Sequence, residues 1–219
     1  MPNHIAHSYF GQRVLSQLPK DLREVYQRDL PVFRLGLYGP DPLIFSFQTK
    51  PISDKLHHHW RKESLPALEH QIRWGTPLQR SFAGGYLLHQ LLDEAIHPTI
   101  YRHMEETNAS HFRMEIRLDR LISEEMGWTT PPEIVVGGKE RAAWAAADFL
   151  APATQAQYLR GLWRMATLMK VFRHLDESNA KRTTQMEKRH ADGLRELLEE
   201  AVTPAARCLT ELLTSAQAS

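Results

Sequence analysis

The chain has 219 residues, enough for one well-buried domain, and 42% hydrophobic with 24% charged residues argues against extended disorder. A net charge of +1 gives no electrostatic reason to expect a nucleic-acid-binding protein. The single cysteine, Cys208, excludes an internal disulfide and fits a reducing compartment. The sequence shows no signal-peptide pattern and no apolar run of about 18 residues, so we expect a cytoplasmic protein without a transmembrane segment.

The first predicted element is an amphipathic helix from Ile5 to Leu18. His7 falls on its apolar side, beside Phe10 and Val14. An imidazole in that position is a candidate metal ligand, with a core or helix-end histidine as the alternative. His4 lies on nearly the same face but could equally belong to an unwound leader.

A loop and a run of three histidines follow. The segment 36–42 (GLYGPDP) has the glycine and proline density of a loop, and Asp41 is held there between two prolines. A stiff backbone aims this carboxylate, although an ordinary turn aspartate would look the same. His57, His58 and His59 precede a helical stretch from residue 63 to 72. One of the three could turn inward while the others remain solvated.

The segment from Phe82 to His97 is predicted to be a helix that carries three potential ligands. His89, Asp93 and His97 are spaced i, i+4 and i+8, which places them on one helix face. A solvated polar stripe is the alternative. Pro98 disfavours the α conformation at His97, so we expect a helix end or bend there. The short connection to Ser110 would then bring the next helix back against this one.

The next predicted helix, residues 111–126, has ionisable residues in the middle of its apolar face. Asn108 or Ser110 is its expected N-cap. His111, Glu115 and Asp119 lie among the apolar side chains, whereas its arginines lie on the opposite face. Burying even a neutral polar group without a partner costs roughly 2–7 kcal/mol, and a bound cation would remove that conflict. The alternative is a set of internally hydrogen-bonded core residues.

The last third of the chain is predicted to be helical and poor in metal ligands. A loop or mobile flap is expected at 129–139, where prolines and glycines are paired. Beyond it, we expect one helix with an apolar stripe and a final helix with a bend at Pro204. The stripe consists of Tyr158, Leu162, Met165, Met169 and Phe172. We therefore expect one domain, 1–219, divided into a metal-bearing helical part (1–126), a loop or flap (127–142) and a helical packing extension (143–219).

Five motifs in this order resemble the bacterial zinc-dependent phospholipase C-like family and, more distantly, the zinc S1/P1 nucleases. They are His-Ser-Tyr-Phe-Gly (7–11), Gly-Pro-Asp-Pro (39–42), His59 or His58, His-x3-Asp-x3-His-Pro (89–98) and His-Phe-x2-Glu-x3-Asp (111–119). The resemblance implies an all-α, multi-helix bundle with a centre of two or three zinc ions. It implies as ligands His7, Asp41, His59 or His58, His89, Asp93, His97, His111 and Glu115. Asp93 would bridge two ions, and Asp41 would bind metal or act as the base.

Two departures from the family bear on the substrate. Secreted members place an N-terminal Trp on one ion, whereas this chain has no Trp before Trp60. Either a third site is absent, or His4 or the N-terminus takes that place. His97 is also two residues nearer to His89 than in the secreted enzymes. Lipid specificity therefore does not follow from the resemblance.

Two functions remain open at this stage. The first is a zinc-dependent phosphate-ester hydrolase, most specifically a phosphodiesterase, in which a metal-bound hydroxide attacks phosphorus and Asp41 is the candidate base. Its substrate would be a small phosphate ester or lipid-like molecule. The second is a non-catalytic, metal-stabilised helical module that binds a partner. An open cleft beside Asp41 would favour the enzyme, and a closed site without exchangeable water would favour the module.

Overall fold

The computed structural model describes residues 4–107, 110–128, 138–146, 150, 153–179 and 185–215. These residues form eleven α-helices and one 3-10 helix, and they include no strand, which confirms the predicted all-α fold. The elements are α1 (His4–Gln17), α2 (Lys20–Gln27), α3 (Leu30–Gly36), η1 (Asp41–Phe45), α4 (Lys50–His58), α5 (Trp60–Glu63), α6 (Leu65–Trp74), α7 (Pro77–Thr107), α8 (His111–Glu125), α9 (Lys139–Ala146), α10 (Gln155–Asn179) and α11 (Gln185–Ser215).

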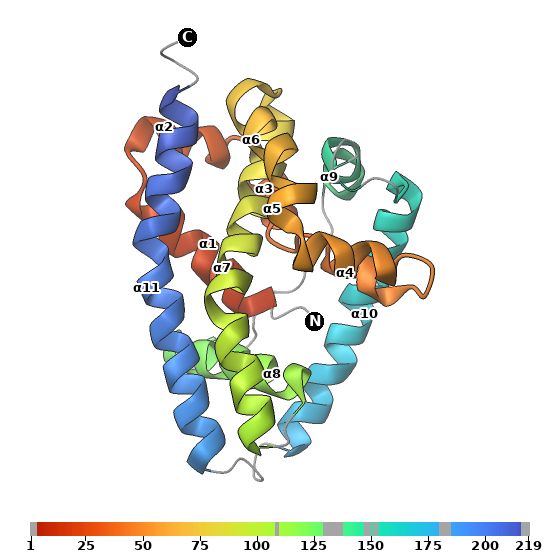
Figure 1. Ribbon diagram of the computed structural model, residues 1–219, viewed down its shortest axis with the longest axis vertical. Coiled ribbons are helices and arrows are strands. Elements are labelled where there is room, and N and C mark those ends of the chain that lie inside the picture. Colours follow the sequence, from red (N-terminus) through yellow and green to blue (C-terminus); the bar gives the residue numbers. More distant parts are fainter. Residues whose placement is uncertain are drawn as a thin grey trace.

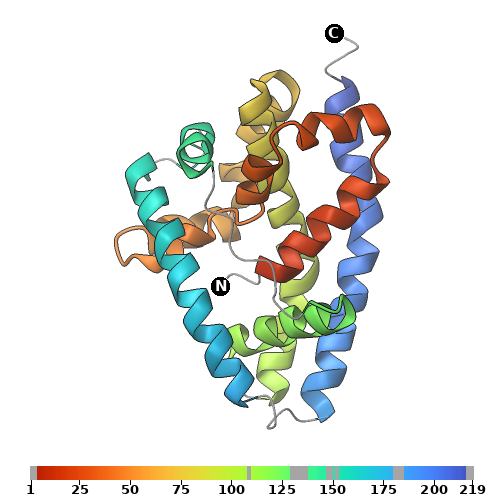
Figure 2. The same ribbon diagram turned by 180° about the vertical axis from the view of Figure 1, so that it is seen from behind.

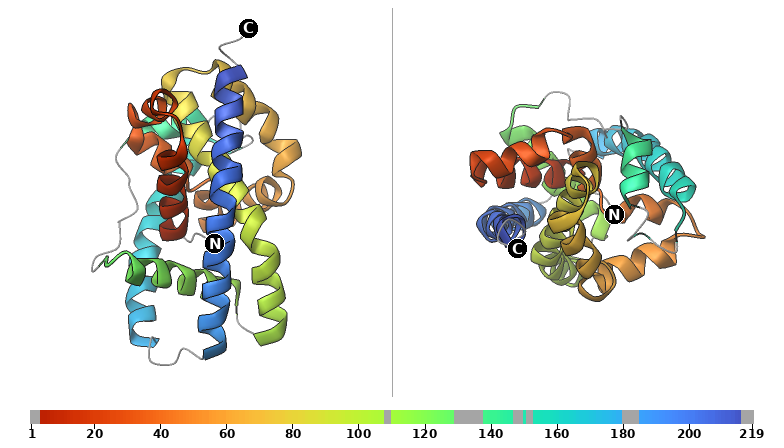
Figure 3. Two further views of the ribbon diagram at one scale, coloured as in Figure 1. Left: turned by 90° about the vertical axis from the view of Figure 1, so that its left-hand side faces the viewer. Right: turned by 90° about the horizontal axis from the view of Figure 1, so that it is seen from above.

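The long helix α7 is the central element of the bundle. It packs against α1, α2, α3, α6, α8, α9 and α11. Figure 1 and the right-hand view of Figure 3 show it between α11 on one side and α10 on the other. Of the helix end or bend predicted at His97, the helix end is wrong, because α7 continues through Pro98 to Thr107. Pro98 removes one backbone hydrogen bond, but Ile96 and Ile100 on either side of it are fully buried. Their burial keeps this stretch in the core.

Glycines allow α3 and α7 to approach each other closely next to the predicted ligands on α7. A Cβ on Gly36 would lie 2.3 Å from the carbonyl oxygen of Phe82, and one on Gly85 would lie 2.1 Å from that of Phe33. Any larger residue at either position would push the helices apart. The contact brings the segment that follows α3, beginning at Leu37, against the ladder face of α7.

Helices α8 and α11 pack against α7 and, together with α1, against each other. The side chain of Ser110 accepts a hydrogen bond from the backbone N–H of Arg113, so Ser110 is the N-cap of α8. Figure 2 shows α1 running alongside α11 with α8 across their lower part. Arg195 of α11 donates to Glu125 of α8 at 2.8 Å and to the Tyr9 hydroxyl of α1 at 2.9 Å. These bonds join the three helices.

The predicted stripe on α10 is confirmed where the structure describes it, because Tyr158, Leu162, Met165 and Met169 are buried. The side chain of Phe172 lies outside the described residues, as do residues 129–137 of the predicted flap. The helix α9 begins inside the range expected for that flap, directly after Gly138. Among the helices that the structure describes, none is both long and apolar enough to span a lipid bilayer.

Candidate metal centre

The predicted ladder on α7 is the centre of a cluster of imidazoles and carboxylates. Oδ2 of Asp93 lies 3.2 Å from Nε2 of His89, and its Oδ1 lies 3.4 Å from Nε2 of His97. The same Oδ1 is 3.3 Å from Nε2 of His7, which comes from α1. Asp93 thus stands between three imidazoles, as expected of a carboxylate that bridges ions.

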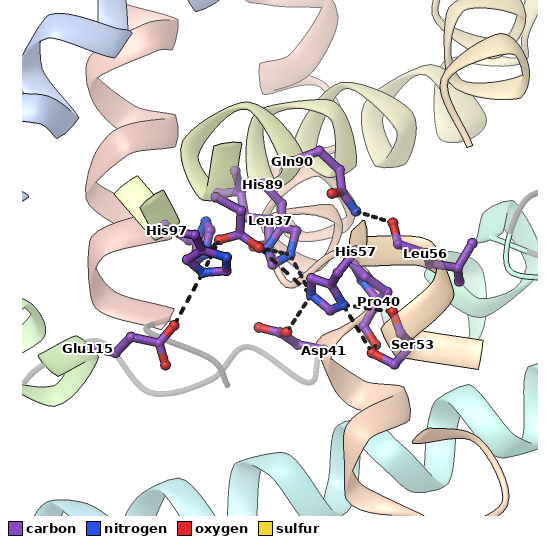
Figure 4. A network of polar contacts seen from close by, with 12 residues as sticks. Leu37, Pro40, Asp41, Ser53, Leu56, His57, His89, Gln90, His97 and Glu115 are labelled. Carbon is purple, nitrogen blue, oxygen red and sulfur yellow. Dashed lines mark hydrogen bonds and ion pairs between the residues drawn. The ribbon is translucent and has the colours of Figure 1, made fainter. Parts of the chain in front are cut away.

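A first group of potential ligands forms where η1, α4 and α7 meet, and consists of Asp41, His57 and His89. Oδ1 of Asp41 is 3.0 Å from Nε2 of His57, and the two Nε2 atoms are 3.4 Å apart. Figure 4 shows these side chains pointing toward one another, with His97 and Glu115 on the far side of the same space.

Backbone carbonyls fix which nitrogen each of these rings presents. Nδ1 of His89 donates to the carbonyl of Leu37 at 3.1 Å, and Nδ1 of His57 donates to that of Ser53 at 2.8 Å. In a neutral ring with Nδ1 protonated, Nε2 carries a lone pair. When both rings are in this neutral form, two imidazole lone pairs and the carboxylate of Asp41 face one another. A divalent cation fits this set of donors, and the carbonyls are the outer partners that metal-binding histidines usually have.

A second group, His97, His111 and Glu115, joins α7 to α8. Nε2 of His111 is 2.9 Å from Oε1 of Glu115, and Nε2 of His97 is 3.6 Å from the same oxygen. Nε2 of His97 is buried and has no hydrogen-bond partner among the described residues. This group likewise offers nitrogen and oxygen donors to one ion.

The third group is His7, His89 and Asp93. Helix α8 holds α1, the helix that carries His7, in place. Oδ1 of Asp119 accepts a hydrogen bond from the backbone N–H of Ala6 at 2.9 Å, and its Oδ2 accepts one from Ile5 at 3.4 Å. Asp119 therefore caps the N-terminus of α1. His4 lies beside Asp119, with Nδ1 3.7 Å from Oδ2, and is not part of any group with His7.

The structure brings His57 into the centre in place of the expected His59 or His58, both of which are exposed. The physical reason is that α4 ends at His58 and the backbone leaves the helical conformation at His59 (φ −124°, ψ 25°). His57 is still inside the helix, four residues after buried Ser53. The i, i+4 spacing from Ser53 and the adjacent buried Leu56 were the signals for it in the sequence.

Buried opposite charges set the ionisation of the centre. Burial alone would raise the pKa of Asp93, but the imidazoles of His97 and His89 hold that pKa well below its usual range. Burial would likewise raise the pKa of Asp41. The charge of His89 and the hydrogen bond with His57 act against burial, and the pKa of Asp41 is lowered. Burial and His89 lower the pKa of His7. Ionised carboxylates beside imidazoles are the form that a metal site requires.

A cavity of about 370 Å³ opens beside the two groups that contain His57 and His97. Its lining combines potential ligands with apolar and aromatic side chains, and includes His57, His58, Asp93, His97, His111, Ile44, Trp60, Pro98 and Tyr101. The ring of Tyr101 contacts those of His97 and His111, with centroids 5.8 and 5.4 Å away. Tyr101 was not expected at the site, since aromatic residues carry no ligand signal in the sequence.

The comparison with known families agrees with this geometry. The family model described as zinc dependent phospholipase C matches residues 6–165, a span that contains every residue of the three groups. No curated protein and no solved structure gives a significant match to the chain. Because the match covers well over half of the sequence, the chain belongs to the zinc-dependent phospholipase C family.

Proposed function

We propose that this protein is a zinc-dependent hydrolase that cleaves a phosphate ester, most specifically a phosphodiester. The observation that carries the proposal is the convergence of three groups of imidazoles and carboxylates around Asp93, next to a cavity that a substrate could enter. A closed cluster would have favoured the alternative, a metal-stabilised binding module. The cavity supports the enzyme, since it is lined by His57, the direct neighbour of Asp41, although Asp41 itself is not part of the lining.

The three groups would hold two or three zinc ions. Asp41, His57 and His89 would hold one, and His97, His111 and Glu115 another. His7 and Asp93 would hold a third ion or complete one of these two sites; since Nδ1 of His89 donates to Leu37, His89 would bind only one of the ions beside it. Bound zinc lowers the pKa of a coordinated water to about 7 and stabilises negative charge on a phosphoryl oxygen.

The chain's own residues would position the substrate and the attacking water. Asp41 would bind metal with His57 and His89 or act as the base toward the attacking water. Ile44, Trp60 and Tyr101 give the cavity an apolar side, which suits the carbon part of an ester.

Substitution of Glu115 tests the proposal. Because Glu115 is buried and sits against His97 and His111, Glu115→Ala should lose one zinc and reduce turnover of bis(p-nitrophenyl) phosphate. The loss should exceed roughly 100-fold, since changes to mere outer partners of a metal site already cost 10–100-fold. Zinc content and initial rates are measured on the same preparations.

Glu124→Ala is the matched control, because Glu124 lies on the same helix and its side chain is 63% exposed. It should keep the zinc and the rate of the wild type. Full activity with normal zinc in Glu115→Ala would overturn the assignment of that residue. A zinc-loaded wild type that turns over neither this diester nor phosphatidylcholine would overturn the proposed reaction.

A further inference from the structure

A second cluster of potential ligands lies away from the family centre, between the lower ends of α7 and α11. It consists of His103 and Glu106 on α7 and His190 on α11. His103 follows His97 by six residues, which moves it about 9 Å along the helix and turns it by about 240°. The cluster thus lies on a different face of α7 from the ladder. Figure 1 shows the two helix ends side by side.

The two imidazoles of this cluster are stacked face to face. Their ring centroids are 3.6 Å apart and the planes are inclined by 14°. Nε2 of His190 lies 3.8 Å from Oε2 of Glu106. One donor atom from each of the three residues lies within 4.8 Å of the others. Donors around one tetrahedral zinc are about 3.4 Å apart, and one ion cannot lie in the planes of two stacked rings. One imidazole and the half-exposed Glu106 side chain would therefore turn when the ion binds.

Burial supports a ligand between these helices. His103 is 9% exposed, and the side chain of His190 is 12% exposed. Nδ1 of His190 is buried and has no hydrogen-bond partner among the residues that the structure describes. A buried polar atom without a partner costs free energy, and a metal ion bound to the ring would offset that cost.

We propose that His103, Glu106 and His190 form a separate site for a divalent transition metal of the zinc class. Two imidazoles and a carboxylate are a common donor set for zinc. The site would join the C-terminal end of α7 to the start of α11 and so stabilise the fold. His190 lies beyond the segment 6–165 that matches the family, so the site is a feature of this chain's own C-terminal helix.

The test compares zinc content between variants after loading with Zn²⁺ and desalting. His190→Gln and Glu106→Ala should each retain one zinc equivalent fewer than the wild type. His70→Gln is the control, because His70 is an exposed histidine on α6 outside every cluster among the described residues, and it should retain all the zinc. Glu106 is exposed in the structure, so its removal leaves the fold intact even if His190→Gln does not fold.

Two further comparisons separate this site from the family centre. Glu106→Ala should hydrolyse bis(p-nitrophenyl) phosphate like the wild type, and the double variant with Glu115→Ala should lose two equivalents, one from each site. If the family centre bound no zinc, the difference between the wild type and Glu106→Ala would still report this site. Equal zinc content in the wild type, His190→Gln and Glu106→Ala would overturn the proposal.

Discussion

The direction of each imidazole in the centre depends on its outer hydrogen bond. The carbonyls of Leu37 and Ser53 accept from Nδ1 of His89 and His57 and thereby turn both Nε2 atoms toward Asp41. A sequence reveals histidines but not the tautomer that the backbone around them selects. For this reason the ladder on α7 could be predicted from its spacing, whereas the choice of His57 over His58 and His59 depended on where α4 ends.

The glycine of the Gly-Pro-Asp-Pro motif has a role that only the structure reveals. Gly39 has a φ of +48°, and a Cβ on it would lie 2.2 Å from Cδ2 of His89. Gly39→Ala should therefore combine a backbone cost of about 1–2 kcal/mol with an overpacking cost of about 1–3 kcal/mol. Displacement of His89 should also lower zinc content. Denaturant unfolding and metal analysis measure the two effects.

Gly127→Ala is the matched control for this prediction. Gly127 also has a positive φ, +64°, but no atom lies within 4 Å of a Cβ placed there. It should lose only the backbone part of the stability, about 1–2 kcal/mol, and keep its zinc. Equal losses in the two variants would show that Gly39 does not support His89.

Zinc and protons compete for the same imidazoles, so stabilisation by zinc should depend on pH. Burial alone would lower the pKa of His89 and of His97, but Asp93, together with Asp41 beside His89 and with Glu115 beside His97, outweighs burial, and both pKa values are raised above the ordinary 6.5. In zinc-free protein these groups contribute stability below pH 6.5, which is lost as the pH rises through their raised pKa values. Zinc requires the neutral rings.

The difference in melting temperature between zinc-loaded and zinc-free protein should therefore grow from about pH 5.5 to about pH 8. Differential scanning fluorimetry at one fixed free zinc concentration measures it. A difference that stays constant over this interval would mean that His89 and His97 do not bind the metal.

At the scale of the elements, α7 and α8 were predictable because their ligands follow the helical period within apolar faces. The length of α7 was not, because a proline rule describes local backbone preference and the buried Ile96 and Ile100 outweigh it here. The role of Asp119 could not be predicted from the sequence either, because it depends on a contact between distant elements. Its position on an apolar face looked like that of a ligand, but it caps α1, an element more than one hundred residues away in sequence.

Helix α10 supports the metal centre through η1, the element that carries Asp41. A Cβ on Gly161 would lie 2.0 Å from the carbonyl oxygen of Pro42. Gly161→Ala should push the two elements apart, cost about 1–3 kcal/mol and weaken zinc binding at Asp41. Gly193→Ala on α11, where a Cβ would meet nothing within 4 Å, should stabilise the protein by up to about 1 kcal/mol. Thermal unfolding with zinc analysis distinguishes them, and a harmless Gly161→Ala would contradict this supporting role.

At the scale of the whole molecule, the fold brings five separate elements to one point. Potential ligands come from α1, η1, α4, α7 and α8, and α10 and α11 cover these elements from the outside (Figures 1 and 2). The all-α class was implied by the resemblance to the family, and the packing role of the C-terminal helices followed from periodicity. The cavity beside the centre did not, since it arises from side chains of elements that meet only in the folded chain.

The central claim is that this cluster binds zinc, and the zinc content of untagged protein purified without chelator tests it most directly. Mass spectrometry should find at least two equivalents in the wild type, one fewer in His57→Ala and no loss in His59→Ala. Protein without bound metal, which also takes up none when zinc is added, would contradict the account and leave a helical bundle with a core of partly charged histidines.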